Sequence, residues 1–362
     1  MPPWNPITGH LLCLAPLLSR FPKDIIQNYL LMELSKDFSK TDNLLYLDLW
    51  PFSMPMIVVT SPDLSIQACQ QHDLTKPAAL KYFLEPFSGG EDLFTMNGLE
   101  WKRSRAMFAP GFNANYLLGQ MGHILEETSV FVEILREHAR KGDMFSLDRL
   151  TCDFTMDIIG AVCLNSHLNS QRQFNPLASA MRSQIAWHLR ADEMNLFKRW
   201  NPAQPLIMWK NSRTMNNYIG KELDKRFIER QGGEKDTSSR SIIDLVLDNY
   251  MTENSSLDMA HGLDQSFKKW AQVQIRLMIF AGHDSTASTI CYSYYLLSKH
   301  PNALAQIRAE HNEVFGTHLK TVSAQLLENP QLINKLSYTN AVLKETLRLF
   351  PRQTLYVVEN QE

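Results

Sequence analysis

The sequence has few of the features that mark membrane, secreted or nucleic-acid-binding proteins. No run reaches the roughly 18 apolar residues of a membrane-spanning helix, and the apolar stretch Leu11–Leu18 is short and broken by Pro16. It lacks a basic region before it and a cleavage site after it, so we expect no secretory signal. The net charge is only −2, which gives no support for a nucleic-acid partner.

Cysteines are scarce and scattered. The chain has five, Cys13, Cys69, Cys152, Cys163 and Cys291, an odd number without paired or metal-binding spacing. This pattern is typical of free thiols in a reducing compartment rather than of a disulfide-bonded secreted protein.

The remaining composition is that of a folded globular protein, with 44% hydrophobic and 20% charged residues in 362. Two runs of β-forming residues, 44–50 and 56–60, predict a hairpin, and 354–358 predicts a further short strand. Residues 76–98 are rich in proline, glycine and aromatic residues and predict a long loop. Apolar periodicity predicts helices over 23–39, 61–72, 115–140, 147–165, 175–187, 214–230, 242–250, 267–299, 302–315 and 336–351. We therefore expect a mainly α fold, a single domain over residues 1–362, with a small β-rich lobe near the N-terminus.

The stretch Ala281–Thr286 (Ala-Gly-His-Asp-Ser-Thr) interrupts the longest predicted helix, 267–299. The flanking residues are apolar, which predicts a core helix. Yet Gly282 costs about 1 kcal/mol relative to alanine in a helix, and buried polar groups need partners. One interpretation is a kink whose hydroxyls are satisfied locally. The other is a flat ligand that Gly282 allows to approach, with Asp284 and Ser285 relaying protons to it.

Two further pairs of polar residues have helical spacing. Trp101 and Arg105 are four residues apart, so they share one helix face and could bind a carboxylate; packing of the arginine stem on the indole is the alternative. Glu345 and Arg348 are three apart and can form an ion pair. Because their neighbours are apolar, we expect this pair to be partly buried rather than a surface pair.

These stretches, in this order, resemble the motifs of cytochrome P-450s, the heme-thiolate monooxygenases. Trp101 and Arg105 match the family's Trp-x-x-x-Arg helix. Residues 281–286 match its oxygen-activation motif, Ala/Gly-Gly-x-Asp/Glu-Thr-Thr, and Glu345 and Arg348 match its Glu-x-x-Arg helix. The resemblance covers essentially the whole chain and is closest to eukaryotic, fungal-like members.

The sequence departs from the family pattern in two ways. Ser285 replaces the usual threonine, which retains the hydroxyl but loses the methyl group that stiffens χ1. The family's cysteine loop, which follows the Glu-x-x-Arg helix and supplies the axial thiolate, has no counterpart before Glu362. We therefore expect an incomplete domain that lacks this loop and the N-terminal anchor, with no iron ligand in this chain.

The resemblance implies a heme cofactor and a reductase partner that supplies electrons from NADPH. The implied reaction inserts one oxygen atom from O2 into an apolar small molecule, for which a secondary metabolite, a lipid and a xenobiotic are candidates. It also implies that the full-length parent lies on the cytosolic face of the endoplasmic reticulum membrane, where this chain makes peripheral contact.

The resemblance also assigns roles to individual residues. Heme binding is assigned to Trp101, Arg105, Ala281 and Gly282, and proton delivery to Asp284, Ser285 and Thr286. The structural core pair is Glu345 and Arg348. Substrate contacts are assigned to the 82–96 loop and to Phe83, Phe87, Leu277, Phe280, Thr354 and Leu355.

Two alternatives remain open from the sequence. One is that the chain is an inactive fragment or pseudo-enzyme of this family, because the axial thiolate is missing. The other is a family member that isomerises or dehydrates a peroxide without a reductase, against which the acid and hydroxyl at Asp284 and Ser285 argue.

Overall fold

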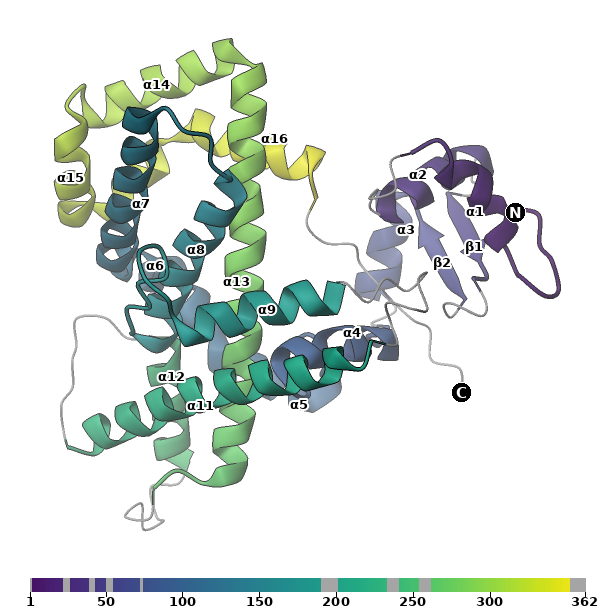
Figure 1. The fold of residues 1–362 in the computed structure, drawn as a ribbon, viewed down its shortest axis with the longest axis horizontal. Helices are drawn as coiled ribbons and strands as arrows, with labels where there is room; N and C mark the ends of the chain where they lie inside the picture. The colour runs from purple at the N-terminus through teal and green to yellow at the C-terminus, as the bar shows by residue number, and fades with distance from the viewer. Residues whose placement is uncertain are drawn as a thin grey trace. The chain divides into compact units, whose positions relative to one another are not determined.

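The structure is a computed structural model that describes residues 2–21, 27–38, 43–49, 55–71, 74–189, 201–232, 241–253 and 262–351. Within these ranges the chain is mainly helical and contains one two-stranded sheet (Figure 1), which confirms the predicted fold class. The chain divides into two compact units, one formed by residues up to Pro77 and the other beginning at Ala78.

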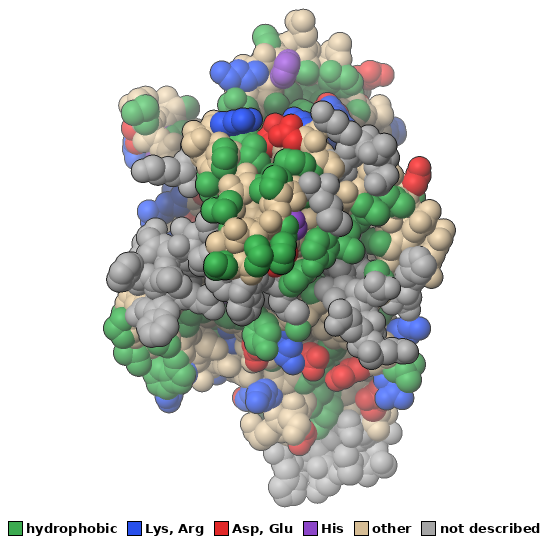
Figure 2. Space-filling view, turned by 90° about the vertical axis from the view of Figure 1, so that its right-hand side faces the viewer, with side chains coloured by type: hydrophobic (Ala, Val, Ile, Leu, Met, Phe, Trp, Pro, Cys, Tyr) green, Lys and Arg blue, Asp and Glu red, His purple; other side chains and the backbone are tan. Residues whose placement is uncertain are grey.

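The first unit contains the predicted hairpin. Its strands pair antiparallel with Leu44 opposite Val59, and alternate residues Leu45 and Leu47 are buried. Its elements are α1 (Leu11–Leu18), α2 (Gln27–Phe38), β1 (Leu44–Leu47), β2 (Met56–Val59), α3 (Pro62–Ile66) and a π-helical turn (Gln67–Gln71). Large apolar side chains such as Trp4 and Ile57 stay exposed in this unit, and Figure 2 shows hydrophobic side chains among polar ones on the side of the molecule that it presents.

The described residues of the second unit form helices joined by loops and turns, without a strand. Its first helices are α4 (Ala78–Ser88), α5 (Gly98–Phe108), the 3-10 turn Ala109–Phe112, α6 (Ala114–Gly119), α7 (Met121–Lys141), α8 (Leu147–Leu164) and α9 (Pro176–Leu189). They are followed by α11 (Ala203–Gln231), α12 (Ile242–Glu253), α13 (Gln265–Lys299), α14 (Pro301–Phe315), α15 (Val322–Glu328) and α16 (Ser337–Leu349), with 3-10 turns at Leu319–Thr321 and Pro330–Lys335. Among these helices of the described ranges, none is both long and apolar enough to cross a bilayer.

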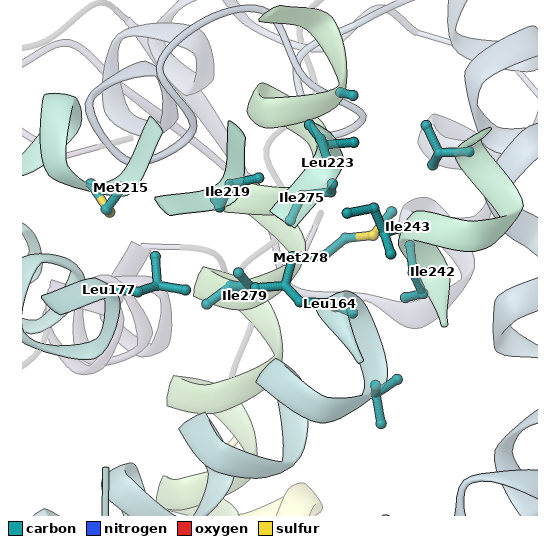
Figure 3. Packing of buried hydrophobic residues seen from close by; sticks show 14 of the residues in the cluster. Leu164, Leu177, Met215, Ile219, Leu223, Ile242, Ile243, Ile275, Met278 and Ile279 are labelled. Atoms are coloured by element: carbon teal, nitrogen blue, oxygen red, sulfur yellow. The ribbon is translucent and has the colours of Figure 1, made fainter. Parts of the chain in front are cut away.

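Helix α13 is the central element of this unit, as the sequence predicts. Asp264 caps its N-terminus by accepting a hydrogen bond from the Phe267 N–H, and Pro301 begins the next helix directly after it. Its Ile275 and Ile279 are fully buried. Figure 3 shows Met278 of α13 among apolar side chains from neighbouring helices, namely Leu164, Leu177, Met215, Ile219, Leu223, Ile242 and Ile243.

The predicted loop at 76–98 is wrong over its first half, because residues 78–88 form helix α4. The helix begins directly after Pro77 and ends before Gly89, which has a positive φ of 85°. Pro86 lies in its last turn, where the missing N–H removes only one intrahelical bond. Burial of Leu84 and Phe87 against the rest of the unit supplies the stabilisation that local sequence does not indicate.

Helix α11 is also longer than predicted, since it begins at Ala203 rather than near Thr214. Pro205 misled the prediction, but it lies in the first turn, where backbone N–H groups have no intrahelical partner. The predicted strand at 354–358 lies outside the described residues, as does the start of the helix predicted at 23–39.

Candidate functional site

The centre of α13 packs closely against α8 at Gly282. A Cβ added to Gly282 would lie 2.7 Å from Cδ1 of Ile159, so a side chain there would collide with α8. Thr155 of α8 donates a hydrogen bond to the backbone carbonyl of His283 at 2.9 Å. The glycine therefore has a packing reason, and its role toward a ligand stays a prediction.

The hydroxyls of Ser285 in this stretch and of Thr289 just after it donate to the helix backbone. Ser285 Oγ donates to the Ala281 carbonyl at 2.7 Å, and Thr289 Oγ1 donates to the Ser285 carbonyl at 2.8 Å. These bonds are those expected for hydroxyls satisfied within the helix. Ala281, Asp284 and Ser285 are half-buried, so the side of α13 that carries them is less covered than the side of His283 and Ala287, which are buried; Thr286 is exposed.

His283 is a residue within this motif to which the sequence analysis assigned no role. Its side chain is buried, and Nδ1 lies 2.8 Å from the Ile279 carbonyl, which makes Nδ1 the protonated nitrogen. Burial lowers the pKa of His283 below its usual value. A neutral imidazole thus lies directly beside Asp284, and no periodicity in the sequence distinguishes it from a core residue.

Trp101 and Arg105 lie one turn apart on α5, as predicted. The guanidinium carbon of Arg105 is 5.7 Å from the centroid of the indole ring, within the range of a cation–π contact. Arg105 is exposed, and no carboxylate among the described residues forms an ion pair with it. Arg105 therefore offers guanidinium donors on an accessible helix face.

Glu345 and Arg348 form the predicted ion pair, but the expectation that it is partly buried is wrong. Arg348 donates from Nε at 2.7 Å and from Nη2 at 2.6 Å to the two carboxylate oxygens. The side chains are 53% and 68% exposed. The buried residue of α16 is Thr346, which accepts a hydrogen bond from Ser293 of α13, so the ion pair lies off the packed face.

Phe83, Phe87 and Phe280, three of the predicted substrate-contacting residues, meet in one aromatic cluster. Phe87 of α4 stacks on Phe280 of α13 with ring centroids 4.3 Å apart, and Phe83 lies 5.8 Å from Phe87. His188 of α9, which the sequence analysis did not single out, contacts both Phe83 and Phe87 at 5.1 and 4.6 Å. Burial lowers the pKa of His188, so its ring is neutral near pH 7.

The other predicted substrate-contacting residues are placed differently. Leu277 is only 2% exposed and belongs to the packed interior. Thr354 and Leu355 lie outside the described residues. Position along a helix does not reveal which side of α13 is covered, because α4, α8, α11 and α16 approach it from distant parts of the sequence.

Arg276 is a buried cation that sequence reasoning missed. It is fully buried, and its guanidinium donates to Ser212 Oγ at 2.8 Å, to Asn216 Oδ1 at 3.0 Å and to the Pro86 carbonyl at 3.4 Å. Burial lowers its pKa to about 10. A Cβ at Gly89 would overlap this guanidinium, so the arginine and the glycine together join α13 to α4 and α11.

Three of the cysteines have environments that disfavour a thiolate. Burial raises the pKa of Cys152 and of Cys163 to about 12, and it raises the pKa of Cys13 above its usual value. These thiols stay protonated near neutral pH, so none of the three is a ready iron ligand.

The structure thus brings together part of the predicted site. Phe280, Ala281, Asp284 and Ser285 lie within six consecutive residues of α13, and the Phe87–Phe280 stack joins α4 to them. Within the described ranges, no side-chain hydrogen bond or ion pair joins Arg105 or Arg348 to these residues.

Comparison with known proteins gives a consistent result. A family model described as "Cytochrome P450" matches residues 2–357. The cytochrome P450 monooxygenase polC of Polytolypa hystricis is 34% identical over 351 residues, which are 97% of this chain and 63% of that protein. The cytochrome P450 monooxygenase acrF of Aspergillus aculeatus is 32% identical, over 92% of this chain and 65% of its own length. The chain therefore spans less than two thirds of these relatives.

Solved structures show the same fold at lower identity. The heme domain of cytochrome P450DA superposes with a TM-score of 0.70 at 20% identity, covering 96% of this chain and 69% of that domain. The cytochrome P450 CYP102L1 gives a TM-score of 0.67 at 18% identity, covering 88% and 68% of the two chains.

Proposed function

The chain belongs to the cytochrome P450 family, and we propose that it forms the greater part of a heme-dependent monooxygenase that inserts one oxygen atom from O2 into an apolar small molecule. The observation that carries this proposal is the family match over residues 2–357 together with the half-buried acid and hydroxyl, Asp284 and Ser285, at the centre of α13. When bound, heme supplies the activation of O2.

The donor chemistry of α5 suits a heme propionate. The Trp101 indole N–H and the Arg105 guanidinium lie on one face, and Arg105 has no carboxylate partner among the described residues. A charge-assisted hydrogen bond to a carboxylate is worth about 1.5–3 kcal/mol. In this proposal the two side chains hold one propionate and thereby fix the orientation of the cofactor.

The less covered side of α13 contributes the small and proton-carrying groups. Ala281 carries only a methyl group, so it leaves room for a flat ring and a small ligand. The Ser285 hydroxyl donates to the Ala281 carbonyl, which leaves its oxygen lone pairs to accept a hydrogen bond from a water. Asp284 and Thr286 add polar groups on either side of Ser285.

The aromatic cluster gives the proposed substrate contacts. Phe83 is 45% exposed and Phe87 is buried behind it against Phe280, so the cluster presents one accessible ring on a rigid base. Rings of this kind favour an apolar substrate and exclude water. Neutral His188 keeps the cluster free of charge near pH 7.

For the whole protein we propose an NADPH-dependent reductase as the electron donor and a position at the cytosolic face of the endoplasmic reticulum membrane. Exposed apolar residues of the first unit, such as Trp4 and Ile57, support peripheral membrane contact. We assign the axial ligand to none of Cys13, Cys152 and Cys163, because burial holds each thiol pKa above its usual value.

The experiment that tests this proposal is a heme titration of the purified chain, followed by Soret absorbance. Arg105→Ala is expected to weaken heme binding at least about tenfold, the loss of one charge-assisted hydrogen bond. Arg103→Ala is the matched control, because Arg103 is an exposed arginine on the same helix. Equal affinity of both variants would remove the propionate role of Arg105.

A second readout tests the chemistry. The carbon monoxide difference spectrum of the reduced, heme-loaded chain reports whether a thiolate binds iron. Absence of a red-shifted, thiolate-type band would agree with the expectation from the sequence that this chain holds no iron ligand. Such a band would overturn that expectation, because one of the five cysteines would then be the ligand.

A further inference from the structure

Two histidines and a glutamate meet on the surface of the second unit, in a part of the chain that the proposed heme and substrate roles do not use. His123 and Glu126 are three residues apart on α7, and His167 follows α8 in the next connection. One potential ligand atom from each of the three lies within 4.8 Å of the others. The two imidazole rings are T-shaped, with centroids 5.7 Å apart.

These side chains match the ligand preferences of zinc. Two imidazole nitrogens and one carboxylate oxygen, with a fourth position left to water, are a common ligand set for this ion. Ligand atoms around tetrahedral zinc lie roughly 3.4 Å apart, so the cluster must contract. Glu126 and His167 are exposed and His123 is half-buried, so their side chains can rotate into place without disturbing the core.

Glu127 supplies an independent reason to expect a cation here. Its side chain is almost fully buried, and Oε1 lies 3.5 Å from Nδ1 of His167. No arginine or lysine among the described residues forms an ion pair with it. A buried carboxylate behind one ring nitrogen, with the other left for the metal, is the usual arrangement around metal-binding histidines.

The segment that carries His167 is already held in position. Gln171 Nε2 donates to Glu127 Oε2 at 3.0 Å, which orients the carboxylate. Asp157 of α8 accepts hydrogen bonds from the backbone N–H groups of Ser170 and Gln171 at 2.8 and 3.0 Å. The loop therefore needs little reorganisation to present its histidine toward α7.

We propose that His123, Glu126 and His167 bind a Zn²⁺ ion that joins α7 to the α8–α9 connection, and that Glu127 is a positioning residue that orients the His167 ring. This site is separate from the heme role proposed above, so either proposal can fail without the other.

The test is zinc binding by the purified 362-residue chain, measured by competition with a zinc-sensitive indicator, with Mg²⁺ and Ca²⁺ as ions that prefer oxygen ligands. Wild-type protein is expected to bind one equivalent. His123→Gln and His167→Gln should each weaken binding at least about tenfold, and Glu127→Gln about 10- to 100-fold. His300→Gln, at an exposed histidine away from the cluster, should leave binding unchanged.

Zinc should also raise the melting temperature of the wild-type protein and of His300→Gln, but not that of the His123→Gln/His167→Gln variant. Circular dichroism without metal checks that each variant is folded. The proposal is overturned if the wild type takes up no zinc, or if the double variant binds it as tightly as the wild type, since the metal would then lie elsewhere, for example on a cysteine.

Discussion

Two basic side chains beside α4 are shielded from water: Arg276 is fully buried and His188 is half-buried. His188 contacts the ring of Phe87, and Arg276 donates to the carbonyl of Pro86, the preceding residue. Burial lowers the pKa of both side chains. With a pKa of about 10 the arginine stays charged at neutral pH, whereas the histidine stays neutral. The same burial thus has opposite consequences for the charge state of the two residues near pH 7.

The lowered pKa of His188 predicts a pH dependence of stability. Between this lowered value and the usual 6.5, the unfolded chain binds the proton more readily than the folded chain. The free energy of unfolding should therefore rise as the pH rises through this window. The contribution of His188 should be complete above pH 6.5 and should be lost as the pH is lowered.

Urea unfolding of the wild type and His188→Gln from about pH 5 to 8 measures this contribution. The free energy of unfolding of the wild type, relative to that of His188→Gln, should increase as the pH rises through this window. His318→Gln, at an exposed histidine, is the matched control. If the free energy of unfolding had the same pH dependence in wild type and in His188→Gln, the half-buried ring of His188 would not be its cause.

At the scale of secondary-structure elements, the contact between α8 and α13 positions the candidate site. Ile159 fills the space above Gly282, and Thr155 hydrogen-bonds to the His283 carbonyl on the same side of α13. The side that carries Ala281 and Ser285 is left less covered. The packing of one helix face therefore decides which residues of the motif a ligand can reach.

Gly282→Ala is expected to destabilise the protein, because the added methyl group would meet Ile159 at 2.7 Å. Overpacking costs about 1–3 kcal/mol, which exceeds the gain of up to about 1 kcal/mol in helix propensity. Ile159→Val removes the nearest atom, so adding it to Gly282→Ala should recover part of the loss in urea unfolding.

Gly119→Ala provides the comparison, because nothing lies within 4 Å of a Cβ added at Gly119 near the end of α6. That change should be neutral or stabilising. If Gly282→Ala were equally well tolerated, the close approach of α8 would not be the reason for the glycine.

At the scale of the whole molecule, the described residues contain two large hydrophobic cores. One surrounds α13 in the second unit, and the other joins Leu17, Leu30 and Leu34 to β1 in the first. No buried residue is shared between them. The division into two compact units raises the question of whether they unfold together.

Separate cores predict separate unfolding transitions in calorimetry of the heme-free chain. Leu47→Ala should lower the transition temperature of the first unit, and Ile275→Ala that of the second. Truncation of a buried leucine or isoleucine to alanine costs about 2–5 kcal/mol of stability. A single transition that both substitutions lower equally would instead support the single domain expected from the sequence.

Much of this protein is determined by the sequence itself. The period of apolar residues predicted the bounds of α8 and α14 within one residue, of α13 within two and of α12 within three, because periodicity is local and strong. The three ordered motifs identified the family. The roles of Trp101, Arg105 and the 281–286 stretch stay predictions, because their chemistry needs a cofactor.

Only the tertiary structure decided which side chains are covered. Helix α4 forms despite Pro86 because Phe87 packs on Phe280, a residue far away in the sequence. Glu345 and Arg348 have apolar neighbours, yet they point away from the packed face. Arg276 and Glu127 are buried by helices whose positions the local sequence pattern does not predict. The sequence determines periodicity and chemistry, whereas exposure and partners depend on contacts between segments that are distant along the chain.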